Sequence, residues 1–282
     1  MNVRHKLGIA SVLGLVAAGA YWSTRPAPND GTRVSFLSVG QGDCTVVRSG
    51  GKTVLIDAGP ATDGYDAGSR IIVPKLRQMG VSQIDMVLLT HPDSDHIGGL
   101  SSITRRISVR SIGVPYHFKG HPELSRELNE AGIRDDQVQW IAGPSMAKFG
   151  DAMLRMDIPQ WDPTTSDNEG SLFVWVGMGA SSVMMTGDAG EIAELQMIKK
   201  GPWTAQYLKL GHHGSRFSSN GGWLDHVKPQ FAVASAGKNN SYGHPAPDTL
   251  ERCRVRGIIV WRTDQHGDLH LKATAKGFVR TR

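Results

Sequence analysis

The chain has 282 residues, of which 39% are hydrophobic and 20% are charged, and this balance suits one large globular domain with a single core. The sequence contains no internal repeat and no long low-complexity stretch, which excludes a repeat or low-complexity protein. A formal net charge of +5 suits a polyanionic substrate or an anionic surface, although many exported proteins are basic and bind neither.

Residues 1–22 have the pattern of a targeting segment. A basic start, Arg4-His5-Lys6, precedes the apolar residues 7–22, and Ala18-Gly19-Ala20 fits a small-x-small cleavage site. The apolar run is short for a free-standing membrane span, which needs roughly 20 apolar residues. A cleaved signal peptide and an uncleaved membrane tether through residues 7–22 are therefore both open.

Residues 23–32 are polar and contain prolines, which predicts a linker before a folded domain at 33–282. Export makes that domain periplasmic, secreted or anchored on the outer face of the membrane. Such compartments are oxidising, so a disulfide between Cys44 and Cys253 is open, but two separate buried thiols are the favoured prediction. Neither cysteine has the CxxC spacing of a structural zinc site.

The first half of the domain alternates β-rich segments with turn signals. The alternation predicts strands at 34–39, 44–48 and 53–57, separated by the turns Gly40-Gln41-Gly42-Asp43 and Ser49-Gly50-Gly51-Lys52. A helix is predicted at 69–80, and an apolar strand, of the kind buried on both faces, at 84–90.

The second half repeats this style, and its last two strands are expected to pair as a hairpin around residues 265–268. Strands with interleaved helices in two halves imply two packed sheets with helices outside. The predicted helices are 122–131, 191–200 and 248–256, and the predicted strands are 171–177, 182–186, 207–210, 231–235, 258–262 and 269–272.

The strongest chemical signal is His91-Pro92-Asp93-Ser94-Asp95-His96, which directly follows the predicted buried strand. In an extended segment, alternate side chains such as His91, Asp93 and Asp95 face a common side. Imidazoles and carboxylates at this density can hold two divalent ions close together. A polar loop with helix-capping aspartates is the plain alternative, but it explains neither histidine.

Three further segments place polar side chains after predicted strands or in a loop. Asp188 ends an apolar strand, where an aspartate alone more often caps a helix. Gly211-His212-His213-Gly214 suggests metal ligation or phosphate contact at close backbone approach. His244, in Tyr242-Gly243-His244-Pro245, could bind substrate or protonate a leaving group, although a lone histidine is more often structural.

Together these segments resemble the metallo-β-lactamase superfamily, and more narrowly the soluble hydrolase domain of ComEC-type competence proteins and their free-standing relatives. The resemblance covers residues 34 to about 272 and implies a four-layer αββα sandwich with a metal site at one edge of the sheets. It is carried by six ordered motifs: Val39-Gly40-Gln41-Gly42-Asp43, Leu55-Ile56-Asp57-Ala58-Gly59, the segment 89–99, Thr186-Gly187-Asp188-Ala189, the segment 208–215 and the segment 239–245.

The resemblance implies a centre for two divalent metal ions. His91 and Asp93 would hold the first ion, Asp95 and His96 the second, and Asp188 would bridge both. One histidine of the pair His212 and His213 would complete the second site and the other would face the substrate. The sequence does not separate these two histidines.

The reaction implied is hydrolysis by water that the metal ions activate. Asp95 is the candidate to orient this water or to accept its proton. His244, the histidine pair and Lys209 are candidates to stabilise developing negative charge. Lys209 is the weakest of these, because a lysine on a strand is more often simply solvated.

Two departures from the superfamily bear on the metal. Most members have histidine where Asp93 stands, whereas ComEC-like members share the aspartate. Thr164 occupies the position before Ser166-Asp167-Asn168 where a further histidine is expected. An oxygen-rich first site suits manganese or magnesium better than zinc and allows a weak or substrate-completed site.

The favoured function is therefore an exported phosphodiesterase, a nuclease whose substrate is DNA. The alternative enzyme is a phosphoester hydrolase acting on a cell-surface polymer, such as a phosphorylcholine ester of teichoic acid. Hydrolysis of a β-lactam is less favoured, because that resemblance is at the level of the fold. The non-enzymatic alternative is a degenerate binding module without turnover.

Overall fold

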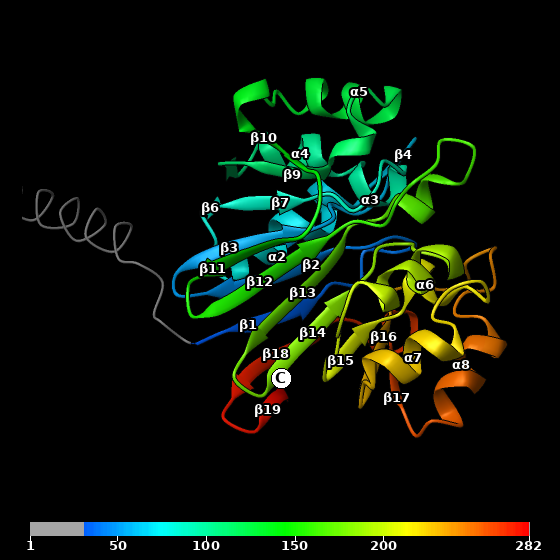
Figure 1. The fold of residues 1–282 in the computed structure, drawn as a ribbon. Helices are drawn as coiled ribbons and strands as arrows, with labels where there is room; N and C mark the ends of the chain where they lie inside the picture. The colour runs from blue at the N-terminus through cyan, green and yellow to red at the C-terminus, as the bar shows by residue number, and fades with distance from the viewer. Residues whose placement is uncertain (1–30, 282) are drawn as a thin grey trace, which may run out of the picture.

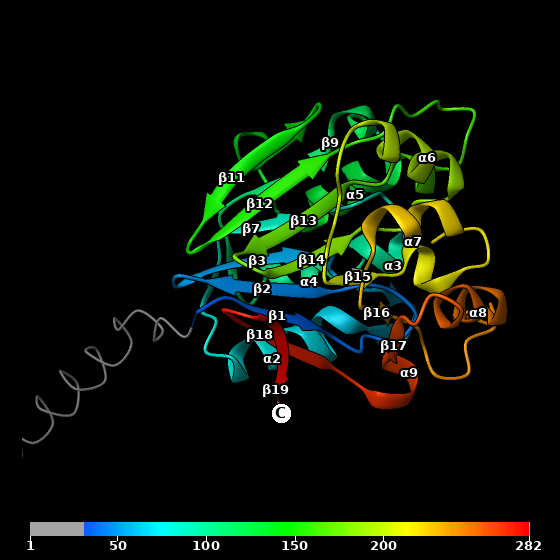
Figure 2. The ribbon, with the colours of Figure 1, turned by 60° about the horizontal axis from the view of Figure 1, so that its bottom comes forward.

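Two β-sheets pack face to face in the computed structural model, which describes residues 31–281 (Figures 1 and 2). The predicted export segment at 1–22 and most of the predicted linker lie outside the described residues. Within residues 31–281, no helix combines the length and apolar character needed to cross a membrane.

The first sheet has eight strands in the order β10-β9-β7-β3-β2-β1-β18-β19. The strand β7 runs parallel to both β3 and β9, so these three strands end at the same edge of the sheet. The strands are β1 (Arg33–Phe36), β2 (Thr45–Ser49), β3 (Lys52–Ile56), β7 (Met86–Leu88), β9 (Ile112–Pro115), β10 (Val138–Ile141), β18 (Leu269–Thr274) and β19 (Gly277–Thr281).

The second sheet has seven strands in the order β11-β12-β13-β14-β15-β16-β17. Strands β14 to β17 are mutually parallel, and their carboxyl ends therefore share one edge. The strands are β11 (Ser145–Phe149), β12 (Ala152–Asp157), β13 (Phe173–Met178), β14 (Ser181–Met185), β15 (Tyr207–Lys209), β16 (Phe231–Ala234) and β17 (Ile259–Arg262).

Helices cover both outer faces, which gives the four layers of an αββα sandwich and confirms the predicted fold (Figure 1). On the first sheet lie α2 (Val73–Gln78), α4 (Leu100–Thr104) and α5 (Pro122–Glu130), and on the second lie α6 (Glu191–Lys199), α7 (Gly221–Val227) and α8 (Pro247–Arg254). Three apolar clusters fill the three interfaces between these layers, as burial of one face per helix and two per inner sheet requires.

Short elements complete the chain. They are the strands β4 (Ala61–Thr62), β5 (Tyr65–Asp66), β6 (Gln83–Ile84) and β8 (Ser108–Val109), and the helices α3 (Ser94–Ile97) and α9 (Thr263–His266). A π-helical turn spans Gly68–Ile72, and 3₁₀ turns span Tyr116–Phe118, Asp135–Gln137, Asp167–Gly170 and Gly211–Gly214.

The predicted final hairpin is wrong. The strand β17 pairs with β16 in the second sheet, whereas β18 pairs with β1 in the first, so the chain crosses between the sheets through α9. The short polar connection that ends at Gly267 has the same sequence pattern in a hairpin turn and in a crossover between two sheets, so the sequence does not distinguish them. The expected strand at 84–90 is also broken at Asp85, whose Oδ2 accepts a hydrogen bond from Thr53 N at 2.9 Å.

The two cysteines are free and buried, as predicted. Cys44 belongs to the apolar cluster between the first sheet and its helices, and Cys253 belongs to the cluster beneath α6, α7 and α8.

Candidate metal centre

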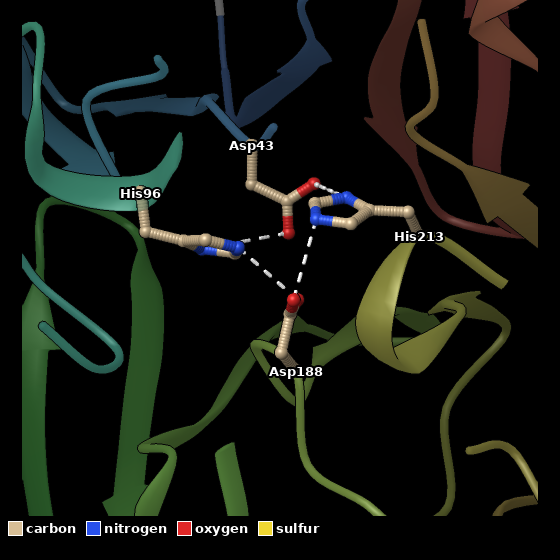
Figure 3. A group of neighbouring side chains, drawn as sticks. All are labelled: Asp43, His96, Asp188 and His213. Carbon is tan, nitrogen blue, oxygen red and sulfur yellow. Dashed lines mark ion pairs between the residues drawn. The ribbon is translucent and has the colours of Figure 1, made fainter. Parts of the chain in front are cut away.

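Four buried side chains meet where the edges of the two sheets come together (Figure 3). Asp43 precedes β2, His96 lies on α3, Asp188 follows β14, and His213 lies on the 3₁₀ turn after β15. One ligand atom from each side chain lies within 4.8 Å of the others. Three of these four residues were predicted as ligands from the sequence, and Asp43 was not.

The other predicted ligands surround this group. The rings of His91 and His96 are 4.2 Å apart between centroids. Asp93 Oδ2 lies 3.5 Å from His91 Nε2, and Asp95 Oδ2 lies 3.0 Å from His213 Nε2. Thus His91 and Asp93 form one small group, whereas Asp95 contacts His213 in the group of four buried side chains.

Hydrogen bonds engage the Nδ1 atom of each central histidine. Asp57 Oδ2 lies 2.8 Å from His96 Nδ1, and the carbonyl of Ser235 lies 3.0 Å from His213 Nδ1. With these nitrogens donating, both Nε2 lone pairs face Asp188, at 3.1 Å from Oδ1 for His96 and 3.3 Å from Oδ2 for His213. Such outer partners orient imidazole ligands at metal sites.

The donor set fits a divalent cation. Among the described residues, Nε2 of His91, Nε2 of His96 and Oδ1 of Asp188 are buried without a hydrogen-bond partner. Unpaired buried polar atoms are costly, and here imidazole lone pairs and a carboxylate oxygen face one another. A cation between them removes this repulsion, and the fold and the cluster together indicate divalent metal use.

In the metal-free protein, the imidazoles of His96 and His213 are expected to be protonated. Burial lowers the pKa of His96, but the carboxylates of Asp188 and Asp57 outweigh it and hold that pKa well above its usual value. Burial similarly opposes charging of His213, and Asp188 raises its pKa well above the usual value. Burial opposes ionisation of Asp188, yet the two histidines hold its pKa well below normal. Metal binding therefore displaces protons from these imidazoles.

Lys209 is buried, not solvated as expected for a strand lysine. Its Nζ forms an ion pair with Asp43, lies 3.6 Å from Asp188 Oδ1, and donates to the carbonyl of Gly187 at 3.1 Å. Burial lowers the pKa of Lys209, but Asp43 and Asp188 outweigh it and raise the pKa above normal. The side chain is only 2% exposed, so this placement favours a role in positioning carboxylates over direct contact with substrate.

Asp43 reaches the centre because its turn lies against the His91–His96 segment. Asp43 N donates to the carbonyl of Asp95 at 3.2 Å. At the preceding Gly42, φ is +145° and a Cβ atom would lie 2.3 Å from that same oxygen, so only glycine allows this approach. The signal in the sequence was the Gly-Gln-Gly-Asp turn, which was recognised as a motif but not as a source of a site residue.

The structure separates the two adjacent histidines. Both have positive φ, 46° for His212 and 54° for His213, a strained backbone that directs the two rings differently. His213 turns into the buried group, whereas the side chain of His212 is 35% exposed and its Nε2 lies 3.7 Å from Asp188 Oδ2. The geometry favours His213 as the ligand and His212 as the substrate-facing histidine.

His212 and His244 form the open side of the centre, with their ring centroids 5.4 Å apart. Burial lowers the pKa of His212, and burial with the neighbouring His212 and His213 lowers the pKa of His244 to about 4. Both imidazoles are therefore neutral near pH 7 and can donate or accept a hydrogen bond.

Thr164 is exposed and does not enter the centre. Its backbone N and its Oγ1 both donate to Asp162 Oδ1 at 2.8 Å, so the side chain stabilises the loop to which it belongs. Asn168 comes closer instead, with Nδ2 at 3.4 Å from His212 Nδ1. Asn168 and Asp57 are thus contacts of the centre that were not predicted individually from the sequence.

Replacing Lys209 with Met is expected to destabilise the metal-free protein by up to about 3–5 kcal/mol, because the buried Asp43 would lose its ion pair with Lys209 and keep only His213 and His96 as positive neighbours. The double variant Asp43→Asn/Lys209→Met removes both charges and should recover most of the loss. Urea unfolding in EDTA measures both. Arg254→Met, which breaks an exposed pair with Glu251, is the control and should leave the stability essentially unchanged.

The same pair makes a pH prediction. Burial opposes ionisation of Asp43, but Lys209 and His213 lower its pKa to about 2. A depressed pKa in the folded state gives stability that is present above the unfolded value of about 3.9 and is lost as the pH falls towards 2. If Lys209→Met is no more destabilising than Arg254→Met, or leaves this acid dependence unchanged, the ion pair does not support the centre.

Comparisons with known proteins agree with this geometry. A sequence model of the metallo-beta-lactamase superfamily matches residues 37–225. Competence protein ComA of Neisseria gonorrhoeae is 33% identical over 267 residues, which cover 93% of this chain and 36% of that protein. ComE operon protein 3 of Bacillus subtilis is 29% identical over 253 residues, which cover 85% of this chain and 33% of that protein. The chain thus spans about a third of the length of these relatives.

Solved structures share the fold at low identity. The diiron β-hydroxylase CmlA from Streptomyces venezuelae superposes with a TM-score of 0.59 at 18% identity, covering 88% of this chain and 55% of CmlA. Zn(2+)-bound PqqB from Methylobacterium extorquens gives a TM-score of 0.57 at 13% identity, covering 85% of this chain and 99% of PqqB. The family match, the αββα layers and the ComEC-like relatives show that this chain belongs to the metallo-β-lactamase superfamily.

Proposed function

We propose that this chain is an exported, metal-dependent phosphodiesterase that hydrolyses DNA. The proposal rests on the buried ligand atoms of His91, His96 and Asp188, which lack a hydrogen-bond partner and suit a bound cation. The open pair of His212 and His244 lies beside them. The DNA substrate is supported by the relative that is named a competence protein, since competence is a process of DNA uptake.

The proposal includes two ions. His91 and Asp93 would hold the first, Asp95, His96 and His213 would hold the second, and Asp188 would serve as a ligand to both. When bound, two divalent ions lower the pKa of a water molecule and neutralise charge on phosphoryl oxygens. The ions expected are manganese or zinc, with magnesium as a further candidate.

The chain's own groups have separate tasks in this mechanism. The side chain of Asp95 is 31% exposed, and although burial opposes its ionisation, His213 and His96 hold its pKa well below normal. It is therefore an ionised carboxylate that can orient the attacking water through Oδ, whereas so low a pKa makes it a weak proton acceptor. Asp57 and the Ser235 carbonyl hold the imidazoles of His96 and His213 in their ligating orientation.

The open side supplies groups for the substrate. His212 and His244 are neutral near pH 7, so either ring can donate a hydrogen bond to a phosphoryl oxygen or to the leaving oxygen, but neither carries the extra proton of an imidazolium. Lys209 stays behind Asp188 and holds Asp43 and the Asp188 carboxylate in place.

A substrate panel tests the proposal. The full chain is assayed on single-stranded DNA, duplex DNA, bis-p-nitrophenyl phosphate and p-nitrophenylphosphorylcholine, with EDTA, manganese, magnesium or zinc. Metal-dependent cleavage of DNA is expected. Cleavage confined to the phosphorylcholine ester would favour a cell-surface substrate, and no turnover with any metal would favour a binding module.

The location is part of the proposal. The basic start and apolar run of residues 1–22 support export, with cleavage after Ala20 or retention as a membrane tether. Cell fractionation with N-terminal sequencing of the mature protein measures this. A full-length chain found wholly in the soluble cytoplasm would refute export and remove extracellular DNA as the substrate.

A further inference from the structure

Three aromatic side chains are prominently exposed in the described part of the chain, and all three lie at the edge that carries the metal centre. Phe217 is 73% exposed, Tyr242 is 70% exposed and Tyr116 is 53% exposed. Exposed aromatic rings contribute little to the core, and three of them on the loops of the edge that carries the centre are available to a ligand there.

The first two rings are tied to the open side of the centre. Phe217 follows His213 by four residues, on the loop after β15. The ring of Tyr242 stacks on that of His244, with centroids 5.8 Å apart and an interplanar angle of 23°. Tyr116 directly follows β9, which runs parallel to β7, so it leaves the first sheet at the same edge as His91.

Basic and polar groups lie between and beside these rings. The guanidinium carbon of Arg216 lies 6.0 Å from the centroid of the Phe217 ring. A hollow of about 400 Å³ opens beside His244, and Lys238, Asn240 and Arg262 are among its lining residues. Arg262 is paired with Asp264 at 2.7 Å, whereas Lys238 is an exposed cation of this hollow. The volume lies in the range of small-molecule sites and suits one nucleotide.

We propose that Phe217 and Tyr242 form a stacking platform for the unpaired bases of a single nucleic-acid strand, with the adjoining nucleotide in the hollow beside His244. The inference rests on the proposed phosphodiesterase function and names its substrate form. Exposed rings beside cations are how proteins hold single strands without reading their sequence, at about 1–3 kcal/mol per stacked base. In a duplex the bases are already stacked on one another, so they offer no free face on which these rings can stack.

A protein partner would require a different surface. The neighbours of these rings on their own loops are exposed polar residues, Arg216 beside Phe217 and Lys238 and Asn239 near Tyr242, rather than aliphatic side chains. Charge is depleted at the centre of protein–protein interfaces, whereas a phosphate backbone requires cations at regular intervals.

The experiment measures binding apart from hydrolysis. Fluorescence anisotropy of a labelled 20-nucleotide strand and of the matching duplex is recorded with the full chain in EDTA, where no turnover occurs. The wild type should bind the single strand more tightly. Phe217→Ala and Tyr242→Ala should each weaken that binding by about 5- to 150-fold, which is the stacking energy converted to affinity, while Phe217→Tyr and Tyr242→Phe should keep it.

Ile259→Ala is the matched control, because Ile259 is 65% exposed but lies at the amino end of β17, opposite the edge that carries the centre. This variant should bind and hydrolyse like the wild type. With manganese present, Phe217→Ala should raise KM for the single strand much more than it lowers kcat. Equal affinity of the wild type for duplex and single strand, or alanine variants that bind like Ile259→Ala, would overturn the inference.

The two proposals fail separately. A chain that hydrolyses no phosphodiester with any metal, but whose single-strand binding in EDTA depends on Phe217 and Tyr242, loses the phosphodiesterase proposal and keeps the stacking surface. A chain that hydrolyses DNA but binds it independently of both rings keeps the enzyme and loses the surface.

Discussion

Changing Asp188 to Ala is expected to lower phosphodiesterase activity by at least about a hundredfold while the fold persists. Loss of an outer partner of a metal ligand alone costs roughly 10- to 100-fold, and Asp188 faces both central histidines directly, at 3.1 Å and 3.3 Å. Without this carboxylate, the two groups of ligands have no shared oxygen. Initial rates on DNA and on bis-p-nitrophenyl phosphate measure the effect, and circular dichroism checks the fold.

Asp225→Ala is the matched control for this variant. Asp225 is an exposed aspartate on α7 that pairs with Arg256 at the surface, so its loss should leave activity unchanged. Asp95→Ala should resemble Asp188→Ala, because it removes the proposed water-orienting carboxylate together with a ligand. A fully active Asp188→Ala protein would refute the assignment of the centre.

Manganese is expected to support turnover better than zinc. Asp93 stands where most members of the superfamily have histidine, and Thr164 is turned away into its own loop, so the first group offers His91 as its imidazole with carboxylate oxygens around it. Oxygen-rich sites favour harder ions. Rates after EDTA treatment and titration with each metal measure the preference.

Asp93→His gives the converse test. A second imidazole beside His91 should shift the preference towards zinc. If the wild type contains two tightly bound zinc ions and manganese adds no activity, or if Asp93→His leaves the ranking of metals unchanged, the argument from ligand hardness is wrong.

The sequence predicted those parts of the centre whose ligands are close together along the chain. His91 to His96 lie within six residues after a buried strand, and no core role explains such a run. Asp188 and the pair that includes His213 were identified because each follows an apolar strand within a recognised motif. Strand ends gather at sheet edges, so a linear pattern was enough to identify these residues.

The remaining features depend on tertiary contacts. Lys209 is a lysine on a strand and Asp43 an aspartate in a turn, and neither position predicts that the two side chains form a buried ion pair. The roles of His212 and His213 depend on two positive φ angles in adjacent residues, which composition does not predict. The pairing of β17 and β18 in different sheets likewise depends on neighbours far away in the sequence.

The central claim, a divalent metal centre built by His91 to His96, Asp188 and His213, is tested most directly by metal content. The full chain and its Asp188→Ala variant are purified, incubated with manganese or zinc, freed of excess metal and analysed by inductively coupled plasma mass spectrometry. The account predicts up to two divalent ions per wild-type chain and a clear loss in the variant. A folded wild-type chain that retains no divalent ion, or a variant that retains as many as the wild type, would contradict it.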